Sequence, residues 1–271
     1  MLKTRIILIA ASIVVVWLIF LLPKAVVENE SQMKSADSAV TKKDSHLPAE
    51  HSQASPALIA RIRKSKAGFQ NSSDKKNAIF ADSLQNLYTQ AGQFDSAAWY
   101  GERAATFFNT TESFLKTGNS FYEAYTFAMD APKQKILAEK AREYLGKVTA
   151  VNPKNYEARI KIAMTYLSSG GPMQGIRQLR EVIAEDPKNE LALLNMGMLS
   201  VQSGQNGKAI EWLKQLVEVN PKHLQGQLLL GVAYLNDGHK TEARAQFEKV
   251  KKMDNDPAVQ ATVESYLRDL K

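Results

Sequence analysis

The chain has 271 residues, of which 44% are apolar and 23% are charged, as is typical of proteins that fold around an apolar core. It contains no cysteine, which excludes disulfides, thiolate metal sites and thiol nucleophiles. The formal net charge is +7, but the predicted folded region lacks the basic stripe typical of nucleic-acid-binding proteins, so we expect no nucleic-acid partner.

The N-terminal region contains an uncharged apolar run from Ile6 to Leu22. As a helix it would reach roughly 26 Å, close to the ~30 Å hydrocarbon core of a bilayer. We therefore predict a transmembrane anchor over residues 1–24. Lys3 and Arg5 precede the run, which favours a cytoplasmic N-terminus. The chain is then a single-pass inner (plasma) membrane protein with its remainder in the periplasm or another extracytoplasmic space. A cleaved secretory signal is the alternative, although its apolar region is normally ~7–15 residues.

A polar stretch follows, over residues 25–54, with almost no large apolar side chains. Such a segment buries too little surface to offset its loss of conformational entropy, so we predict a flexible spacer. Ser55 followed by Pro56 is a typical helix start and predicts a basic leading helix over 55–77. The basic cluster is either a solvated helix face or a surface that attracts anionic lipid head groups. Its members are Arg61, Arg63, Lys64, Lys66, Lys75 and Lys76, opposed only by Asp74.

A period of 34 residues marks the second half of the chain. Pro153, Pro187 and Pro221 recur at this spacing, each after Asn or Asp and before Lys. Seventeen residues after these prolines stand Gly170, Gly204 and Gly238. The pattern predicts two helices per unit, because glycine accepts the left-handed conformation that ends the first helix and proline cannot continue the second.

This pattern resembles the tetratricopeptide repeat in its small-residue, tyrosine, glycine, alanine, phenylalanine and proline positions. The large aromatic residue often found early in the first helix is replaced by Arg159, Leu193 and Gln227, and Ser200 replaces one tyrosine. The resemblance implies an all-α fold, a right-handed superhelix of antiparallel helix pairs, here preceded by one N-terminal transmembrane helix. It also implies a solenoid that binds other proteins and is not an enzyme.

The match continues upstream in a looser form. Residues 78–110 form one unit, and residues 111–155 form an irregular unit that exceeds the ~34-residue period. The excess predicts an extended helix or a longer loop near residues 129–135. We therefore predict an array of about five repeats over 78–257 and a C-terminal capping helix over 258–271, because the open end of a stack must be covered.

The first helices of such an array are expected to line a concave groove. The residues predicted to form this protein-binding groove are Ile160, Met164, Leu191, Leu194, Asn195, Met198, Val201, Gln202, Leu228, Val232, Leu235 and Asn236. An apolar groove with methionines suits a helical or extended apolar segment of a partner protein whose identity is unknown. A membrane-anchored scaffold, such as an envelope assembly factor, is the function we expect. Two alternatives stay open: the residues pack within the chain, or the groove joins two copies of a structural protein.

Motifs for catalysis or cofactor binding are missing from the sequence. The four histidines, His46, His51, His223 and His239, have no histidine partner one helical turn away, which argues against a metal site. The glycine-rich stretch at 204–210 lacks the strand and the Ser or Thr of a phosphate loop, so we read it as a turn. We therefore expect no enzymatic activity, cofactor, metal or small-molecule substrate. Of the residues that grip a C-terminal carboxylate in one branch of the family, only Asn195 has a counterpart, so carboxylate capture is not expected.

Overall fold

The computed structural model describes residues 54–70, 74–168 and 170–270. Over these residues the chain forms twelve α-helices and no strand, so the predicted all-α class is confirmed. None of the helices within this part of the chain is both long enough and apolar enough to cross a membrane. The predicted anchor at 1–24, its orientation and nearly all of the predicted spacer at 25–54 lie outside the described residues.

The helices follow one another with short connections. They are α2 (Pro56–Gln70), α3 (Asp74–Gln90), α4 (Phe94–Phe108), α5 (Thr111–Phe127), α6 (Ala131–Val151), α7 (Tyr156–Ser168), α8 (Pro172–Glu185), α9 (Glu190–Gln202), α10 (Asn206–Val219), α11 (Leu224–Asn236), α12 (Lys240–Met253) and α13 (Pro257–Asp269).

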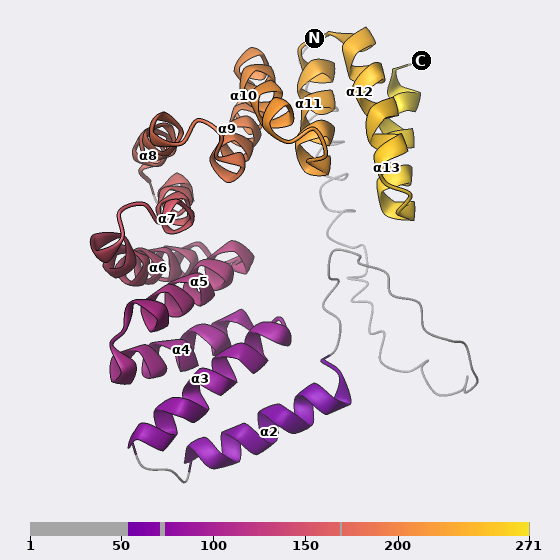
Figure 1. Cartoon of the computed structure of the whole chain (residues 1–271). Helices are drawn as coiled ribbons and strands as arrows, with labels where there is room; N and C mark the ends of the chain where they lie inside the picture. Colours follow the sequence, from indigo (N-terminus) through magenta and orange to yellow (C-terminus); the bar gives the residue numbers. More distant parts are fainter. Residues whose placement is uncertain (1–53, 71–73, 169, 271) are drawn as a thin grey trace, which may run out of the picture. The chain divides into compact units, whose positions relative to one another are not determined.

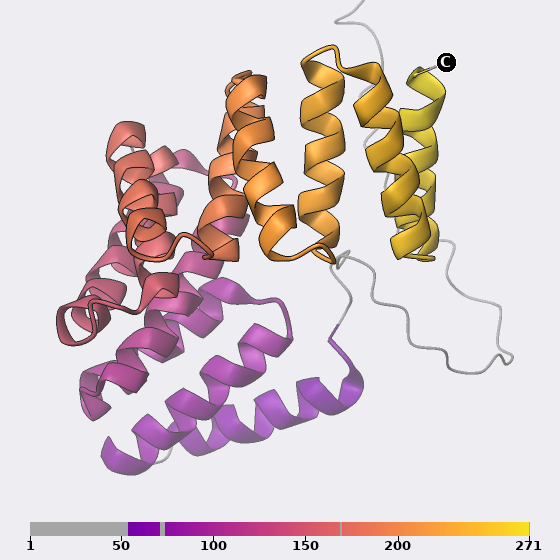
Figure 2. The ribbon, with the colours of Figure 1, turned by 45° about the horizontal axis from the view of Figure 1, so that its top comes forward.

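Five helix pairs build the array, and each helix packs against the next along the chain. The pairs are α3 with α4, α5 with α6, α7 with α8, α9 with α10, and α11 with α12 (Figures 1 and 2). The first helices also pack against one another, because α5 contacts α7, α7 contacts α9, and α9 contacts α11. The first helices therefore share one face of the stack. Among the described second helices, α4 and α6 are joined by side-chain contacts, through Glu102 to Lys140 and Asp95 to Lys133.

The boundary between units is a tight turn that the proline motif builds. At Asn220, the side-chain oxygen accepts a hydrogen bond from the Lys222 N–H at 3.1 Å, and the backbone oxygen accepts one from the His223 N–H at 3.0 Å. His223 then caps α11, because its Nδ1 accepts from the Gly226 N–H at 3.0 Å. Such a cap satisfies one of the backbone donors that a helix start leaves unpaired. His223 thus has a structural role.

The turn inside each pair depends on the glycine that the sequence places there. Gly204 has a φ of 70°, which L residues with a side chain rarely adopt. The Gln205 N–H donates to the Ser200 oxygen at 2.9 Å, and the Gly204 N–H donates to the Val201 oxygen at 3.1 Å. This is the Schellman arrangement that satisfies the last carbonyls of a helix. Gly92, Gly170 and Gly238 have φ values of 67°, 87° and 82°, so the predicted left-handed glycine turns are confirmed.

The small residue in the middle of each first helix allows the paired helices to approach closely. A Cβ atom on Gly197 would lie 2.6 Å from Cγ of Leu213, which is well inside the optimum separation of two carbon atoms. Leu213 is fully buried. The position therefore needs glycine because the facing leucine has no room to move aside.

Polar side chains replace the aromatic residue early in two first helices, and they bond to the preceding turn. Gln227 is fully buried, and its Nε2 donates to the Pro221 carbonyl at 2.7 Å. In an earlier unit Arg159 donates to the Pro153 carbonyl at 3.4 Å and to Glu185 at 2.8 Å. Hydrogen bonds thus anchor the helix start where an aromatic ring would otherwise pack.

The ends of the array differ in detail from the expected boundaries. The leading helix expected over 55–77 ends at Gln70, and α3 already begins at Asp74. The intervening sequence, Asn71, Ser72 and Ser73, consists of residue types that favour turns and caps over helix interiors. At the other end α13 covers the last pair, with Val263 and Leu267 buried in a cluster with the α12 residues Ala243, Phe247 and Val250.

The irregular unit accommodates its extra length within its helices. α5 and α6 have 17 and 21 residues, whereas α9 and α10 have 13 and 14. The connection between α5 and α6 is short, and Asp130 caps α6 by accepting from the Lys133 N–H at 2.8 Å. The extended helix predicted for this unit is therefore observed, whereas the alternative of a longer loop is not. The right-handed sense of the superhelix stays a prediction.

Candidate protein-binding face

The predicted groove residues lie on three first helices, α7, α9 and α11, and differ in how far they reach the surface. Leu191 is 39% exposed, and Gln202 and Asn236 are also exposed. Most of the others are half-buried: Met164, Leu194, Met198, Val201, Leu228, Val232 and Leu235. Only part of the predicted set is therefore open to a partner.

Two of the predicted residues lie in the interior. Ile160 is 1% exposed and belongs to a core cluster with Ala163, Leu179 and Val182. Asn195 is 8% exposed, and its Nδ2 donates to the Leu191 carbonyl at 2.7 Å within the same helix. Ile160 faces the second helix of its own pair, and the Asn195 amide nitrogen is bonded to a backbone carbonyl one turn earlier in the same helix. Neither residue is available to line a groove.

Several half-buried residues serve the array's own packing. Leu194 and Val201 pack against the cluster that includes Leu213 and Leu216. Leu228, Val232 and Leu235 pack against the C-terminal cluster that includes residues of α12 and α13. Each of these side chains thus packs partly within the chain, as one of the alternatives predicted, and part of it remains exposed to solvent. We use "first-helix face" for the surface that remains on α9 and α11: Leu191, Leu194, Met198, Val201, Gln202, Leu228, Val232, Leu235 and Asn236.

A polar cavity of about 700 Å³ lies farther toward the N-terminus, between α2, α3 and α5. Among its lining residues, Gln85 Nε2 donates to Ser120 Oγ at 2.9 Å, and both residues are buried. Arg61 and Lys64 contribute positive charge from α2. The other lining residues are Ser65, Ser83, Gln85, Asn86, Leu87, Thr89, Gln90, Lys116, Asn119, Ser120 and Glu123.

This cavity was not expected from the sequence, although a signal for it is present. Three amide residues and one serine form the adjacent pairs Gln85–Asn86 and Asn119–Ser120 on two first helices. In the later units the equivalent positions are apolar or small. The match to the repeat is loose upstream of residue 153, so the sequence predicted a binding surface only on the later units.

Charged groups connect the cavity to the next pair. Lys161 of α7 donates to Asn119 at 2.9 Å and to Glu157 at 2.5 Å. Burial raises the pKa of the Glu123 carboxyl, and the charge of Lys161 opposes this shift. The side of the cavity toward α7 therefore combines one half-buried acid with a cation held by neighbouring side chains.

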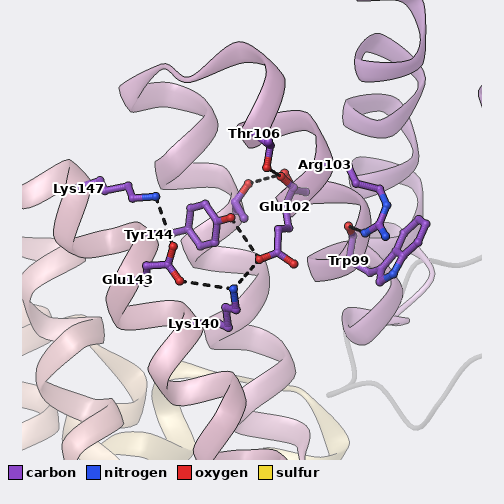
Figure 3. Close-up of polar contacts among 10 residues, drawn as sticks. Trp99, Glu102, Arg103, Thr106, Lys140, Glu143, Tyr144 and Lys147 are labelled. Atoms are coloured by element: carbon purple, nitrogen blue, oxygen red, sulfur yellow. Dashed lines mark hydrogen bonds and ion pairs between the residues drawn. The ribbon is translucent and has the colours of Figure 1, made fainter. Parts of the chain in front are cut away.

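A second polar network joins α4 to α6 (Figure 3). Glu102 accepts from Lys140 Nζ at 2.7 Å and from the Tyr144 hydroxyl at 3.3 Å. The hydrogen bond to Glu102 is the main cause of the raised pKa of Lys140. Burial, followed by the charges of Glu102 and Glu143, raises the pKa of Tyr144 to about 12. Each of these ionisable groups has a partner, so the network is a structural bridge between two second helices.

An exposed aromatic group lies beside this network on α4. The Arg103 guanidinium stacks on Trp99, 3.0 Å from the ring centroid, and its Nη1 donates to the Trp99 carbonyl at 2.9 Å (Figure 3). Desolvation lowers the pKa of Arg103. Among the described residues no group of three or more His, Asp or Glu side chains is arranged to hold a metal ion.

The fold and its faces define a solenoid of antiparallel helix pairs, built from a 34-residue unit with a glycine turn inside and a proline turn at the end. Residues 160–218 and residues 200–265 each match a family model described as tetratricopeptide repeat. The matches support the tetratricopeptide repeat family for this chain, and they fall where the 34-residue period is most regular.

Solved structures show the same fold. A tetratricopeptide repeat protein from Parabacteroides merdae is similar with a TM-score of 0.56 and 17% identity, over 79% of this chain and 78% of that one. A thermophilic TPR protein from Thermus thermophilus is similar with a TM-score of 0.52 and 19% identity, over 72% and 100%. A MamA fragment from Desulfovibrio magneticus is similar with a TM-score of 0.50 and 18% identity, over 65% and 94%. No curated protein matches the sequence.

Proposed function

We propose that the chain is a membrane-anchored scaffold that binds an apolar segment of a partner protein along its first-helix face. The support comes from α9 and α11, whose sequences ELALLNMGMLSVQ and LQGQLLLGVAYLN contain a single charged residue, Glu190. A surface helix normally has a charged side opposite its apolar side. These helices lack one, yet each has residues that the rest of the chain leaves exposed or half-buried.

The second helices of the same pairs provide the comparison. α10 and α12 have charged, exposed side chains such as Glu211, Lys214 and Glu248 on the side away from their core residues. The contrast between α9 and α10, and between α11 and α12, supports a binding surface on the two first helices. Leu191 and Leu194 lie one turn apart on α9, with Met198 and Val201 farther along the same side. A helical or extended apolar segment that covers this row would remove its remaining surface from water.

Membrane attachment is the second part of the proposal. The run from Ile6 to Leu22 supports it, because the run is uncharged and its length suits a bilayer. With the N-terminus in the cytoplasm, the repeats would present the first-helix face to proteins on the outer side of the inner membrane. Deleting residues 1–24 is expected to move the chain from the membrane pellet to the supernatant. Persistence of the shortened chain in carbonate-washed membranes would contradict the anchor.

Photo-crosslinking in intact cells tests partner binding. A photoreactive phenylalanine analogue in place of Leu191 is expected to form an adduct with a different protein, because this side chain is 39% exposed on the first-helix face. The matched control places the same analogue at Lys214, which is exposed on α10, and is expected to give no such adduct. Adducts at both positions, or at neither, would refute the proposed binding face.

A charge substitution at the same position gives a second measurement. Leu191→Glu is expected to lower recovery of the crosslinked or co-purified partner at least tenfold, since an unpaired carboxylate would have to be buried against apolar groups. The helix content and melting temperature of the variant are expected to stay close to those of the parent chain, because Leu191 is 39% exposed and belongs to none of the core clusters of the described residues. An adduct that contains only copies of this chain would favour the self-associating alternative and contradict the scaffold.

A further inference from the structure

The first described helix, α2, has one side that packs and one side that is uncovered. Ile62 and Phe69 pack on the cluster that includes Ala81, Leu84 and Tyr100, and the Phe69 ring lies 5.3 Å from that of Tyr100. Apart from these contacts, α2 packs on α3. On the opposite side Ala60 and Ala67 are exposed, so α2 ends the described array with an open surface.

All charged residues of α2 are basic. Arg61, Arg63, Lys64 and Lys66 are exposed, and the helix contains no acidic residue. None of the four forms an ion pair with another described residue. Some cations elsewhere in the array pair with acids, as Lys140 does with Glu102, whereas Lys214 of α10 and Lys249 of α12 form no ion pair with a described residue. What distinguishes α2 is that four such cations lie on one helix without an acidic residue. The positive charge of α2 is therefore uncompensated within the described chain.

The helical register places long basic side chains on either side of two small alanine side chains. At about 100° per residue, Ala60 and Ala67 lie in the middle of the uncovered side, with Arg63 on one flank and Lys64 on the other. Lys66 and Arg61 lie at the two margins of this side, next to the packed face. Ile59, which is 46% exposed, lies on the same flank as Arg63. The small alanines let the backbone approach a flat surface, while the long basic side chains reach past them to either side.

We infer that this outer face of α2, defined by Ile59, Ala60, Arg63, Lys64, Lys66 and Ala67, docks on an anionic lipid surface. The argument rests on charge complementarity, because a negatively charged bilayer attracts such a run of unpaired cations near its surface. The two cavities near α2 reach only the edges of this face, where Lys64 lines one and Ile59 lines the other. Lys75 and Lys76 continue the positive charge at the start of α3, where both are exposed.

The docked state would hold the leading end of the array against the membrane and leave α9 and α11 to the partner. The inference uses none of the residues of the first-helix face, so its failure would leave the proposed partner binding intact. Conversely, loss of crosslinking at Leu191 would say nothing of the contact between α2 and lipid.

Because the sequence contains no cysteine, a single introduced cysteine can be labelled specifically in the full chain. A single Ala57→Cys substitution, on the exposed first turn of α2, is labelled with a fluorophore after reconstitution into lipid nanodiscs. The discs contain phosphatidylcholine alone or phosphatidylcholine mixed with phosphatidylglycerol, and each contains a head-group quencher. We expect stronger quenching in the anionic discs at low ionic strength. We expect this difference to disappear at about 1 M salt, where the Debye length is ~3 Å.

Charge-matched variants test whether α2 makes the contact. Arg63→Gln with Lys66→Gln is expected to reduce the docking equilibrium in anionic discs by roughly tenfold or more, since each cation near an anionic surface contributes about a fivefold factor. Lys249→Gln with Lys252→Gln removes the same charge from the exposed side of α12 and is expected to leave quenching unchanged. Equal quenching in both lipid compositions, or equal loss in both double variants, would overturn the inference. Both pairs are exposed side chains, so circular dichroism is expected to show unchanged folding.

Discussion

A Cβ atom on Gly231 would lie 2.7 Å from Cε1 of Phe247. The paired helices α11 and α12 are therefore in close contact where the Phe247 ring packs against the backbone at Gly231. Phe247 is fully buried and stacks on Tyr266, with ring centroids 4.8 Å apart. The ring is enclosed on both sides and has no space into which to retreat. The contact therefore makes glycine a packing requirement in the middle of a helix, where alanine would otherwise be preferred.

Gly231→Ala is expected to lower the free energy of unfolding by about 1–2 kcal/mol, because overpacking outweighs the gain in helix propensity. Gly146→Ala is the matched control, since Gly146 also lies inside a helix but has no atom within 4 Å of an added Cβ. The control is expected to be neutral or to stabilise by up to about 1 kcal/mol. Urea denaturation measures both, and equal effects of the two substitutions would refute the packing account.

Gly204→Ala separates backbone strain from packing. An added Cβ at Gly204 meets nothing within 4 Å, but the residue has a φ of 70°. We expect destabilisation of about 1–2 kcal/mol, the cost of the left-handed conformation for a residue with a side chain. Gly207 likewise has open space around an added Cβ and a φ outside the left-handed region. Gly207→Ala is therefore expected to leave the melting temperature nearly unchanged, and a comparable loss there would contradict the prediction.

Tyr122 makes the chain sensitive to alkali. Burial, with a smaller contribution from Tyr125, raises the pKa of Tyr122 to about 12 from an ordinary value of 10.0. The unfolded chain thus releases this proton first, so stability is intact below pH 10 and falls as the pH rises from 10 toward 12. Between pH 10 and pH 12 the free energy of unfolding is expected to fall less in Tyr122→Phe than in the parent chain, by an amount on the order of 1–2 kcal/mol. It is expected to change little at pH 7.

Denaturation at several pH values, together with the absorbance of ionised tyrosine, measures the alkaline effect. Tyr144 shares the raised pKa but also donates a hydrogen bond to Glu102, so Tyr144→Phe is expected to lose stability at pH 7 as well. The difference between the two variants at neutral pH is the internal comparison. A Tyr122→Phe variant that loses stability with pH as steeply as the parent chain would refute the assignment.

The capping helix α13 gives the fourth prediction. Leu267 is 9% exposed and belongs to the C-terminal cluster with Phe247 and Val250. Leu267→Ala is expected to destabilise the last helix pair by about 2–3 kcal/mol, from lost apolar burial and the cavity left behind. Ser265→Ala, at an exposed position two residues away, is expected to have no measurable effect. Hydrogen exchange should show faster exchange of α12 and α13 in the leucine variant alone, and unchanged exchange there would contradict the role of α13 as a cap.

The sequence predicted the regular part of this fold because its signals are local. A glycine such as Gly238, seventeen residues after a proline, specifies a left-handed turn wherever it occurs, and its φ of 82° bears this out. An Asn-Pro-Lys turn likewise places its own hydrogen bonds within a few residues, as Asn220 does with Lys222. The looser units upstream were harder to delimit, because α5 and α6 depart from the 34-residue length.

What the sequence by itself determined was the helix pair, its period and its turns, together with an apolar excess on α9 and α11. Only the tertiary structure decided which of those apolar side chains stay in contact with solvent, since burial depends on neighbours from other units. Ile160 and Asn195 carry the periodicity of a groove residue, yet packing and a backbone hydrogen bond hold them inside. The same holds for the bridge from Glu102 to Lys140, whose partners lie 38 residues apart, a separation at which pairing is set by how the helices stack.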